Sequence, residues 1–485
     1  MIYWCESALI GGVATQAVRI HADSAGQITR IEADVAAHAG DVRLGTVLPG
    51  MANAHSHAFH RALRGRTHAN GGTFWVWRET MYAAAAALDP ASYYDLAKAV
   101  FAEMVTAGWT AVGEFHYVHH SPDGTPYGSQ HGLAGQSGLP ELPGPPDSRE
   151  HAMELALVSA AREVGIRLTL LDTSYLRGGI GAELSADQRR FGDGSANGWL
   201  KRWHSLNQLL GADGTGVATT AGIPDASSVV LGAALHSVRA LTRDDIRTIL
   251  DGLPAKTPLH IHLSEQPQEN IDCLAEYGLT PTELLDELGS LSPRLSVVHA
   301  THLSARDIAL LGDAGVGVVM CPTTEADLAD GIGPARALAD AGARIALGSD
   351  QNAVVDPFLE ARGLEAGERL ATGFRGRFNP AELLTALTES GYQSLGLGHG
   401  GIRVGSWCDL VEVDAGSVRT TGSATEQLVL TATASDVLQV IVGGRLVAVD
   451  GQLYSPATPG TVTDPAVLLR AALSVLAART NEMAS

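Results

Sequence analysis

The chain has 485 residues, of which 45% are hydrophobic and 18% are charged, a composition typical of a globular protein rather than a disordered or fibrous one. Its net charge of −20 disfavours binding to nucleic acid or to an anionic membrane surface, because both carry charge of the same sign. The four cysteines have no C-x-x-C spacing, and no basic segment precedes an apolar run at the start of the sequence, so we expect a cytoplasmic protein without a disulfide framework.

Both ends of the sequence contain short strand patterns. Residues 1–46 alternate between apolar and polar positions and are interrupted by turns, but such a piece is too small to fold alone. Residues 407–413 and 437–454 show the same pattern of short strands and glycine turns. We therefore predict a small β-sandwich domain built from 1–46 and 399–485, which ends in an amphipathic helix at 464–479.

Between these ends, residues 47–398 alternate apolar strand-like runs with helical patterns, as parallel sheets with crossover helices do. The eight runs lie near residues 47–57, 109–117, 166–175, 229–237, 258–264, 295–300, 316–321 and 344–350. Helix start signals between them include Asp89, Thr242 and Ser304. The pattern predicts an α/β fold with a (β/α)8 barrel of the TIM type, with irregular loops at 124–147 and 211–228.

Histidines and carboxylates occur where these predicted strands end, which is where barrel enzymes keep their active sites. His55 and His57 are two residues apart, so on a strand both imidazoles point to one face and can bind one cation. That pair alone is weak evidence among 18 histidines. Later strand ends supply His236, His260, His262, Glu265, His299 and Asp350. Each of these residues alone could be an ordinary core or turn residue. Their shared position at one end of the predicted barrel favours an active site.

Several strings of residues resemble the amidohydrolase superfamily, in particular its aminohydrolase branch. They include LPGMANAHSH, HIHLSEQ, VVHATHL, GSDQN and GSWCDLVEVD, and the resemblance extends over nearly the whole chain. The strings SHAFHRALRG, FWVWRETMY, VGEFHYVHHSPDG and LHSVRA are more specific and are similar to the formimidoylglutamate deiminases of that branch. The resemblance implies hydrolysis of N-formimidoyl-L-glutamate to N-formyl-L-glutamate and ammonia in histidine degradation. It also suggests a homodimer.

The same resemblance implies one zinc ion per chain and a place beside it for water. The ligands carried over are His55, His57, His262 and Asp350. Asp350 would take a proton from the water, His299 would hold that water, and Glu265 would carry a proton to the departing nitrogen. A second metal bridged by a carboxylated lysine is not expected, because no lysine ends a predicted strand. The three lysines are Lys98, Lys201 and Lys256.

Substrate contacts are also implied by the resemblance. Arg78 and Arg239 would pair with the carboxylates of an anionic small molecule, because a guanidinium matches a carboxylate better than an ammonium does. Tyr117 and His236 would be their hydrogen-bonding neighbours. His60 stands where the family often has glutamine, and an imidazole cannot copy both atoms of an amide. His60 remains a predicted substrate contact, and the exact formimino acid stays open.

Two alternatives remain. A related zinc aminohydrolase would act on a heterocyclic amine such as guanine, whereas two arginines favour an acyclic dicarboxylate. A barrel that had lost catalysis would have lost part of the ligand set, which is complete here.

Further histidines are interpreted as loop residues or residues behind the ligands, namely His119, His120 and His302. The aromatic residues at helical spacing are interpreted as packing residues, namely Trp75, Trp77 and Tyr82.

Overall fold

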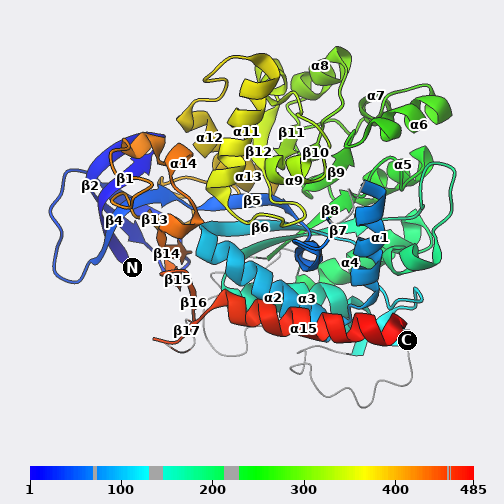
Figure 1. Cartoon of the computed structure of the whole chain (residues 1–485), viewed down its shortest axis with the longest axis horizontal. Helices are drawn as coiled ribbons and strands as arrows, with labels where there is room; N and C mark the ends of the chain where they lie inside the picture. Colours follow the sequence, from blue (N-terminus) through cyan, green and yellow to red (C-terminus); the bar gives the residue numbers. More distant parts are fainter. Residues whose placement is uncertain (69–73, 130–145, 212–228, 456–457, 459, 485) are drawn as a thin grey trace.

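The computed structural model describes residues 1–68, 74–129, 146–211, 229–455, 458 and 460–484. Most of the two predicted loops, 124–147 and 211–228, therefore lies outside the described residues. An eight-stranded parallel sheet forms a nearly closed barrel, and a nine-stranded sheet from both chain ends lies beside it (Figure 1). None of the described helices is long and apolar enough to cross a membrane.

The barrel confirms the predicted α/β architecture. Its strands are β5 (Met51–Ser56), β6 (Trp109–His116), β7 (Arg167–Ser174), β8 (Val229–Leu235), β9 (Leu259–Leu263), β10 (Leu295–His299), β11 (Gly317–Met320) and β12 (Arg344–Leu347). Neighbouring strands pair in sequence order, and Ser56 bridges to Asp350 across the seam between β5 and β12. At that seam His57 N–H donates to Asp350 O, and Asp350 N–H donates to His55 O, both at 2.9 Å. Closure thus holds the end of the first strand against the end of the last.

The longer helices surround the barrel. The helices are α1 (Phe74–Ala86), α2 (Pro90–Ala107), α3 (Ala152–Val164), α4 (Ala196–Leu210), α5 (Arg243–Gly252), α6 (Pro267–Tyr277), α7 (Pro281–Glu287), α8 (Ala305–Asp313), α9 (Pro322–Asp327), α10 (Ala335–Ala341), α11 (Pro357–Thr372), α12 (Pro380–Leu387), α13 (Glu389–Ser394), α14 (Leu428–Thr431) and α15 (Pro465–Ala484). The three predicted start signals, Asp89, Thr242 and Ser304, each form a capping box. The predicted terminal helix is α15, which packs along α2 with an ion pair of 2.7 Å between Arg479 and Asp89 (Figure 1).

The nine-stranded sheet joins the two ends of the chain. Its strands are β1 (Ile2–Ile10), β2 (Val13–Ala22), β3 (Ile28–Glu32), β4 (Val42–Pro49), β13 (Leu410–Val413), β14 (Val437–Val442), β15 (Arg445–Val449), β16 (Gln452–Tyr454) and β17 (Val462–Thr463). β4 pairs with β1 on one side and with β13 on the other. Gln27 also bridges to Trp407, so the sheet curls around an apolar cluster that includes Val18, Leu44 and Leu410. The domain boundaries at 46/47 and 398/399 stay a prediction.

The first predicted strand, 47–57, is in fact two strands in two different sheets. β4 ends at Pro49 and β5 begins at Met51, with Gly50 between them. A Cβ at Gly50 would lie 2.6 Å from both Asp409 Cβ and Thr110 Oγ1, and the Gly50 N–H donates to Asp409 O at 2.7 Å. Only glycine fits this crossing, which leads the chain from the terminal sheet directly into the strand that carries the first two histidines.

Candidate active site

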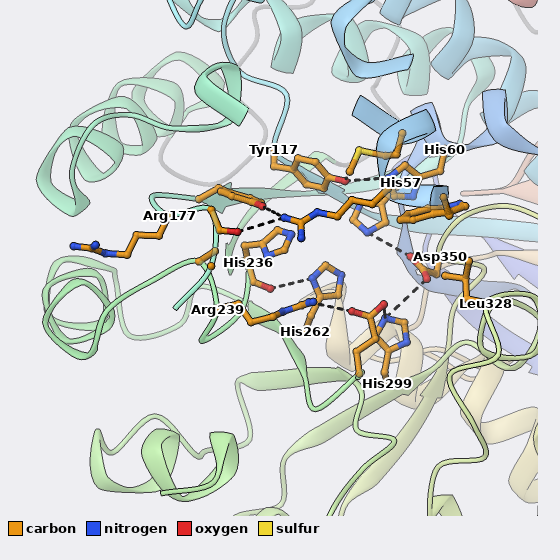
Figure 2. A pocket seen from close by; sticks show the side chains of 18 of the residues that line it. His57, His60, Tyr117, Arg177, His236, Arg239, His262, His299, Leu328 and Asp350 are labelled. Atoms are coloured by element: carbon orange, nitrogen blue, oxygen red, sulfur yellow. Dashed lines mark hydrogen bonds and ion pairs between the residues drawn. The ribbon is translucent and has the colours of Figure 1, made fainter. Parts of the chain in front are cut away.

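Three imidazoles and one carboxylate meet at the carboxyl end of the barrel. His55 and His57 come from the end of β5, His262 from β9, and Asp350 from the segment after β12. The Nε2 atoms of His55 and His262 are 3.2 Å apart. Asp350 Oδ1 lies 3.4 Å from His55 Nε2 and 3.4 Å from His57 Nε2. His57, His262 and Asp350 face one another around this centre in Figure 2.

Two of the three ring nitrogens that face the centre, those of His57 and His262, carry lone pairs. His57 Nδ1 contacts the carbonyl oxygen of Phe115 at 2.8 Å, and His262 Nδ1 contacts that of His236 at 2.9 Å. A carbonyl oxygen only accepts, so each Nδ1 carries the proton and each Nε2 is left as an acceptor. Burial also lowers the pKa of His55, His57 and His262, that of His57 to about 3, so these rings are neutral at pH 7.

This donor set fits a divalent metal ion. A tetrahedral zinc ion with the usual Zn–N distances holds neighbouring ligand atoms roughly 3.3 Å apart. The separations of 3.2 Å and 3.4 Å between donors in the cluster match that value. Without a cation, the lone pair of His57 Nε2 would face the Asp350 carboxylate at 3.4 Å, an acceptor against an acceptor. The two Nδ1–H groups bonded to carbonyls are also the usual outer support of metal-binding histidines.

His260 and the three lysines, none of which is a predicted metal ligand, lie away from the cluster of imidazoles. His260 points to the other side of β9, and its Nε2 contacts Ser394 O at 3.0 Å. Lys98 and Lys201 lie in α2 and α4, and Lys256 lies in the turn before β9. None of the three lysines lines the pocket above the imidazoles. Among the described residues there is therefore no lysine positioned to bridge a second ion.

His299, the last residue of β10, stands beside the cluster among three carboxylates. Its Nδ1 lies 3.5 Å from Glu325, and its Nε2 lies 3.9 Å from Asp350 and 4.0 Å from Glu265. Burial opposes a charge on this ring, but the Glu325 carboxylate beside Nδ1 and the carboxylates of Glu265 and Asp350 raise the pKa of His299 to about 10. The φ angles of His299 and Asp350 are 69° and 42°, a left-handed backbone that side chains rarely adopt outside functional sites.

Three residues of the cluster, His57, His262 and Asp350, line a pocket of about 230 Å³. Every site residue predicted from the sequence lines this pocket except His55, which is fully buried. Trp77, predicted only as a packing residue, also lines it, and its ring meets His60 edge to face at 5.1 Å. His60 Nε2 is 3.0 Å from Tyr117 OH, so these two predicted substrate contacts are hydrogen-bonded to each other.

The two predicted carboxylate-binding arginines are held differently. Arg78 donates from Nε to Tyr82 OH at 2.5 Å and from Nη2 to Tyr175 OH at 3.3 Å. Arg239 donates from Nη2 to Glu265 Oε2 at 3.0 Å. Arg78 thus donates to two tyrosine hydroxyl groups, whereas Arg239 is paired with a residue predicted to carry protons.

Sequence reasoning did not single out Tyr175, Arg177 or Glu325. Tyr175 and Arg177 line the pocket beyond β7, and the strand-end argument applied to the predicted strand 166–175 would have found Tyr175. Arg177 extends away from the imidazoles (Figure 2). Glu325 lies in α9, where its Oε1 accepts from Cys321 N–H at 2.8 Å. No strand-end signal marks Glu325, because it reaches His299 from a helix.

His119 belongs to a second buried cluster. His116, His119 and Glu154 place possible ligand atoms within 4.8 Å of one another. However, Glu154 Oε1 accepts from His119 Nδ1 at 2.7 Å and from Arg202 Nη1 at 3.0 Å. A guanidinium already supplies the positive charge that a metal ion would bring. We interpret this cluster as an ion network between α3, α4 and the barrel wall. The other two histidines that were interpreted as loop residues or residues behind the ligands, His120 and His302, do not line the pocket.

Comparison with known proteins identifies the family. The sequence pattern of the Amidohydrolase family matches residues 46–447. The chain is 33% identical to a formimidoylglutamate deiminase of Pseudomonas aeruginosa over 464 residues, 93% of this chain and 95% of the relative. It is 28% identical to an 8-oxoguanine deaminase of that organism, over 84% of this chain and 82% of the relative. The crystal structure of an amidohydrolase from Brucella melitensis superposes with a TM-score of 0.83 at 29% identity and covers 100% of both chains. The chain therefore belongs to the Amidohydrolase family and is an enzyme that acts on a small molecule.

Proposed function

We propose that the chain hydrolyses N-formimidoyl-L-glutamate to N-formyl-L-glutamate and ammonia, with one zinc ion per chain. The observation that carries the proposal is one pocket in which a cluster of four possible metal ligands lies beside Arg78 and Arg239. A protein with a net charge of −20 needs local guanidinium groups to hold a dicarboxylate. The 33% identity to a formimidoylglutamate deiminase supports the same substrate.

The pocket residues have separate parts in this reaction. When bound, the zinc ion supplies a nucleophile at neutral pH by lowering the pKa of a coordinated water. Asp350 accepts the proton that the water loses, and His299 donates a hydrogen bond that holds the attacking oxygen. Glu265 gives a proton to the departing nitrogen. A C–O bond forms at the amidine carbon, and the C–N bond breaks with release of ammonia rather than an amide anion.

A substrate panel measured with and without a chelator tests the proposal. Ammonia release is expected to be fastest from formimidoyl-L-glutamate, slower from formimidoyl-L-aspartate and absent from guanine. Dialysis against a chelator should abolish it, and added zinc should restore it at about one ion per chain. Faster turnover of guanine would favour the heterocyclic alternative. Full activity of metal-free protein, or two tightly held ions per chain, would contradict the zinc site as proposed.

Arg239→Met tests recognition of the substrate carboxylate. Methionine keeps much of the side-chain volume but removes the guanidinium, and hydrogen bonds between charged groups contribute about 1.5–3 kcal/mol. We expect KM for formimidoyl-L-glutamate to rise about 10- to 100-fold, measured by steady-state ammonia release. Arg247→Met, at an exposed position on α5, is the matched control. An unchanged KM in Arg239→Met would remove Arg239 from the binding site.

The same proposal includes a homodimer, a cytoplasmic location, a place in histidine degradation and no binding to nucleic acid. The first three rest on the resemblance to formimidoylglutamate deiminases. The last rests on the charge of −20.

A further inference from the structure

Glu269, in the first turn of α6, is a buried carboxylate directly behind the pocket. Its side chain has no exposed surface, and it does not line the pocket. One carboxylate oxygen, Oε1, accepts from the backbone N–H of Ser264 at 3.0 Å. The other, Oε2, lies 3.2 Å from Nε of Arg239. Glu269 therefore contacts two segments that follow neighbouring strands of the barrel, the loop after β8 and the end of β9.

The contact with Arg239 fixes one edge of a guanidinium. Arg239 keeps 20% of its side chain exposed to the pocket, and its Nη2 donates to Glu265 at 3.0 Å. Glu269 faces the Nε edge, so the guanidinium lies between two carboxylates. A buried charge that loses its partner is strongly destabilising, so Glu269 and Arg239 hold each other in place.

The contact with Ser264 fixes a turn. Ser264 has a φ of 49°, a left-handed conformation that residues with a side chain rarely adopt. Besides the bond from its N–H to Glu269, its hydroxyl donates to Asn270 Oδ1 at 2.8 Å, so α6 holds this residue twice. Ser264 stands between His262 and Glu265. Its conformation therefore sets the direction in which Glu265 leaves the strand.

We propose that Glu269 is a positioning residue that fixes Arg239 and Glu265 relative to each other. One buried side chain on α6 then fixes the positions of both Arg239, which would bind the substrate carboxylate, and Glu265, which would carry the proton. This inference rests on the proposed function. Because Glu269 does not reach the pocket, it acts only through the residues that it holds.

The variant Glu269→Gln separates the two contacts. A glutamine oxygen can still accept from Ser264 N–H, but its NH2 group removes the negative charge that lies 3.2 Å from Nε of Arg239. We expect KM for formimidoyl-L-glutamate to rise about tenfold and kcat to fall by less. The Kd of N-formyl-L-glutamate, measured by calorimetry, should rise by a similar factor. Glu269→Asp, which keeps the charge, should stay within about threefold of the wild type. Glu276→Gln, exposed on the same helix, is the control.

A double-mutant cycle with Arg239→Met decides between positioning and a merely structural role. If Glu269 acts through Arg239, then Glu269→Gln should change neither KM nor Kd further in the Arg239→Met background. Additive effects, or an unchanged KM and Kd in the single variant, would overturn the inference while leaving an active wild type. If thermal unfolding shows that Glu269→Gln does not fold, Glu269→Met, which has a similar length and no charge, completes the same cycle. A wild type that releases no ammonia from formimidoyl-L-glutamate would instead remove the proposed function and this inference with it.

Discussion

Asp350→Asn is expected to lower kcat/KM for ammonia release by at least about 10⁴-fold. Asparagine has the same shape, but it brings no negative charge to the metal site and cannot accept the proton of the attacking water. Asp350 Oδ1 lies 3.4 Å from both His55 and His57, so its charge is central to the donor set. Metal content, measured by elemental analysis, should fall together with activity.

The fold should survive Asp350→Asn, because the seam of the barrel uses the backbone of residue 350. His57 N–H donates to its carbonyl, and its own N–H donates to His55 O. Thermal unfolding and circular dichroism check this point. Asp244→Asn, at a position on α5 whose side chain is 89% exposed, removes the same charge elsewhere and should leave activity unchanged. Normal activity and full metal content in Asp350→Asn would remove residue 350 from the ligand set.

The placement of the imidazoles could be predicted because strand geometry is regular. Side chains two residues apart share a face, so His55 and His57 converge while His260 and His262 alternate. Parallel strands in sequence order also bring their carboxyl ends to one rim, so residues almost 300 positions apart meet. The repeating pattern of the barrel therefore contains most of the information about the predicted metal site.

Other contacts could not be predicted, because they depend on how outer helices pack. Glu269 and Glu325 reach the strand ends from α6 and α9, and helical periodicity alone marks them only as polar positions in a first turn. The partners of Arg239 are of the same kind: its two carboxylates lie 26 and 30 residues away, beyond any local pattern. The division of 47–57 at Gly50 was missed for a related reason, since the apolar run continues through a change of sheet.

Geometry also separates the predicted roles of the acidic residues around His299. Asp350 contacts the imidazole cluster, whereas Glu325 contacts His299 from the far side, at Nδ1. Glu265 faces Nε2 of His299 through Oε1 and Arg239 through Oε2. Of these three acidic residues, Glu265 is the one that contacts both Arg239, the proposed carboxylate contact, and His299 beside the proposed metal site. Loss of its carboxyl group should therefore slow the reaction without removing the metal ion.

Glu265→Gln is accordingly expected to lower kcat by about 10²- to 10⁴-fold, the usual effect of losing a general acid or base. Glutamine can still accept the hydrogen bond from Arg239, but it carries no proton to the departing nitrogen. Metal content should remain that of the wild type, in contrast to Asp350→Asn, because no zinc ligand is changed. Steady-state ammonia release, thermal unfolding and elemental analysis together measure these effects.

Two comparisons make the result for Glu265 decisive. Glu265→Asp keeps a carboxyl group on a shorter side chain, so it should recover part of kcat if proton transfer is the function lost. Binding of N-formyl-L-glutamate to Glu265→Gln should change little, because the hydrogen bond between residue 265 and Arg239 is kept. Loss of metal in Glu265→Gln would instead place Glu265 in the ligand set. An unchanged kcat would mean that the proton reaches the departing nitrogen from another group.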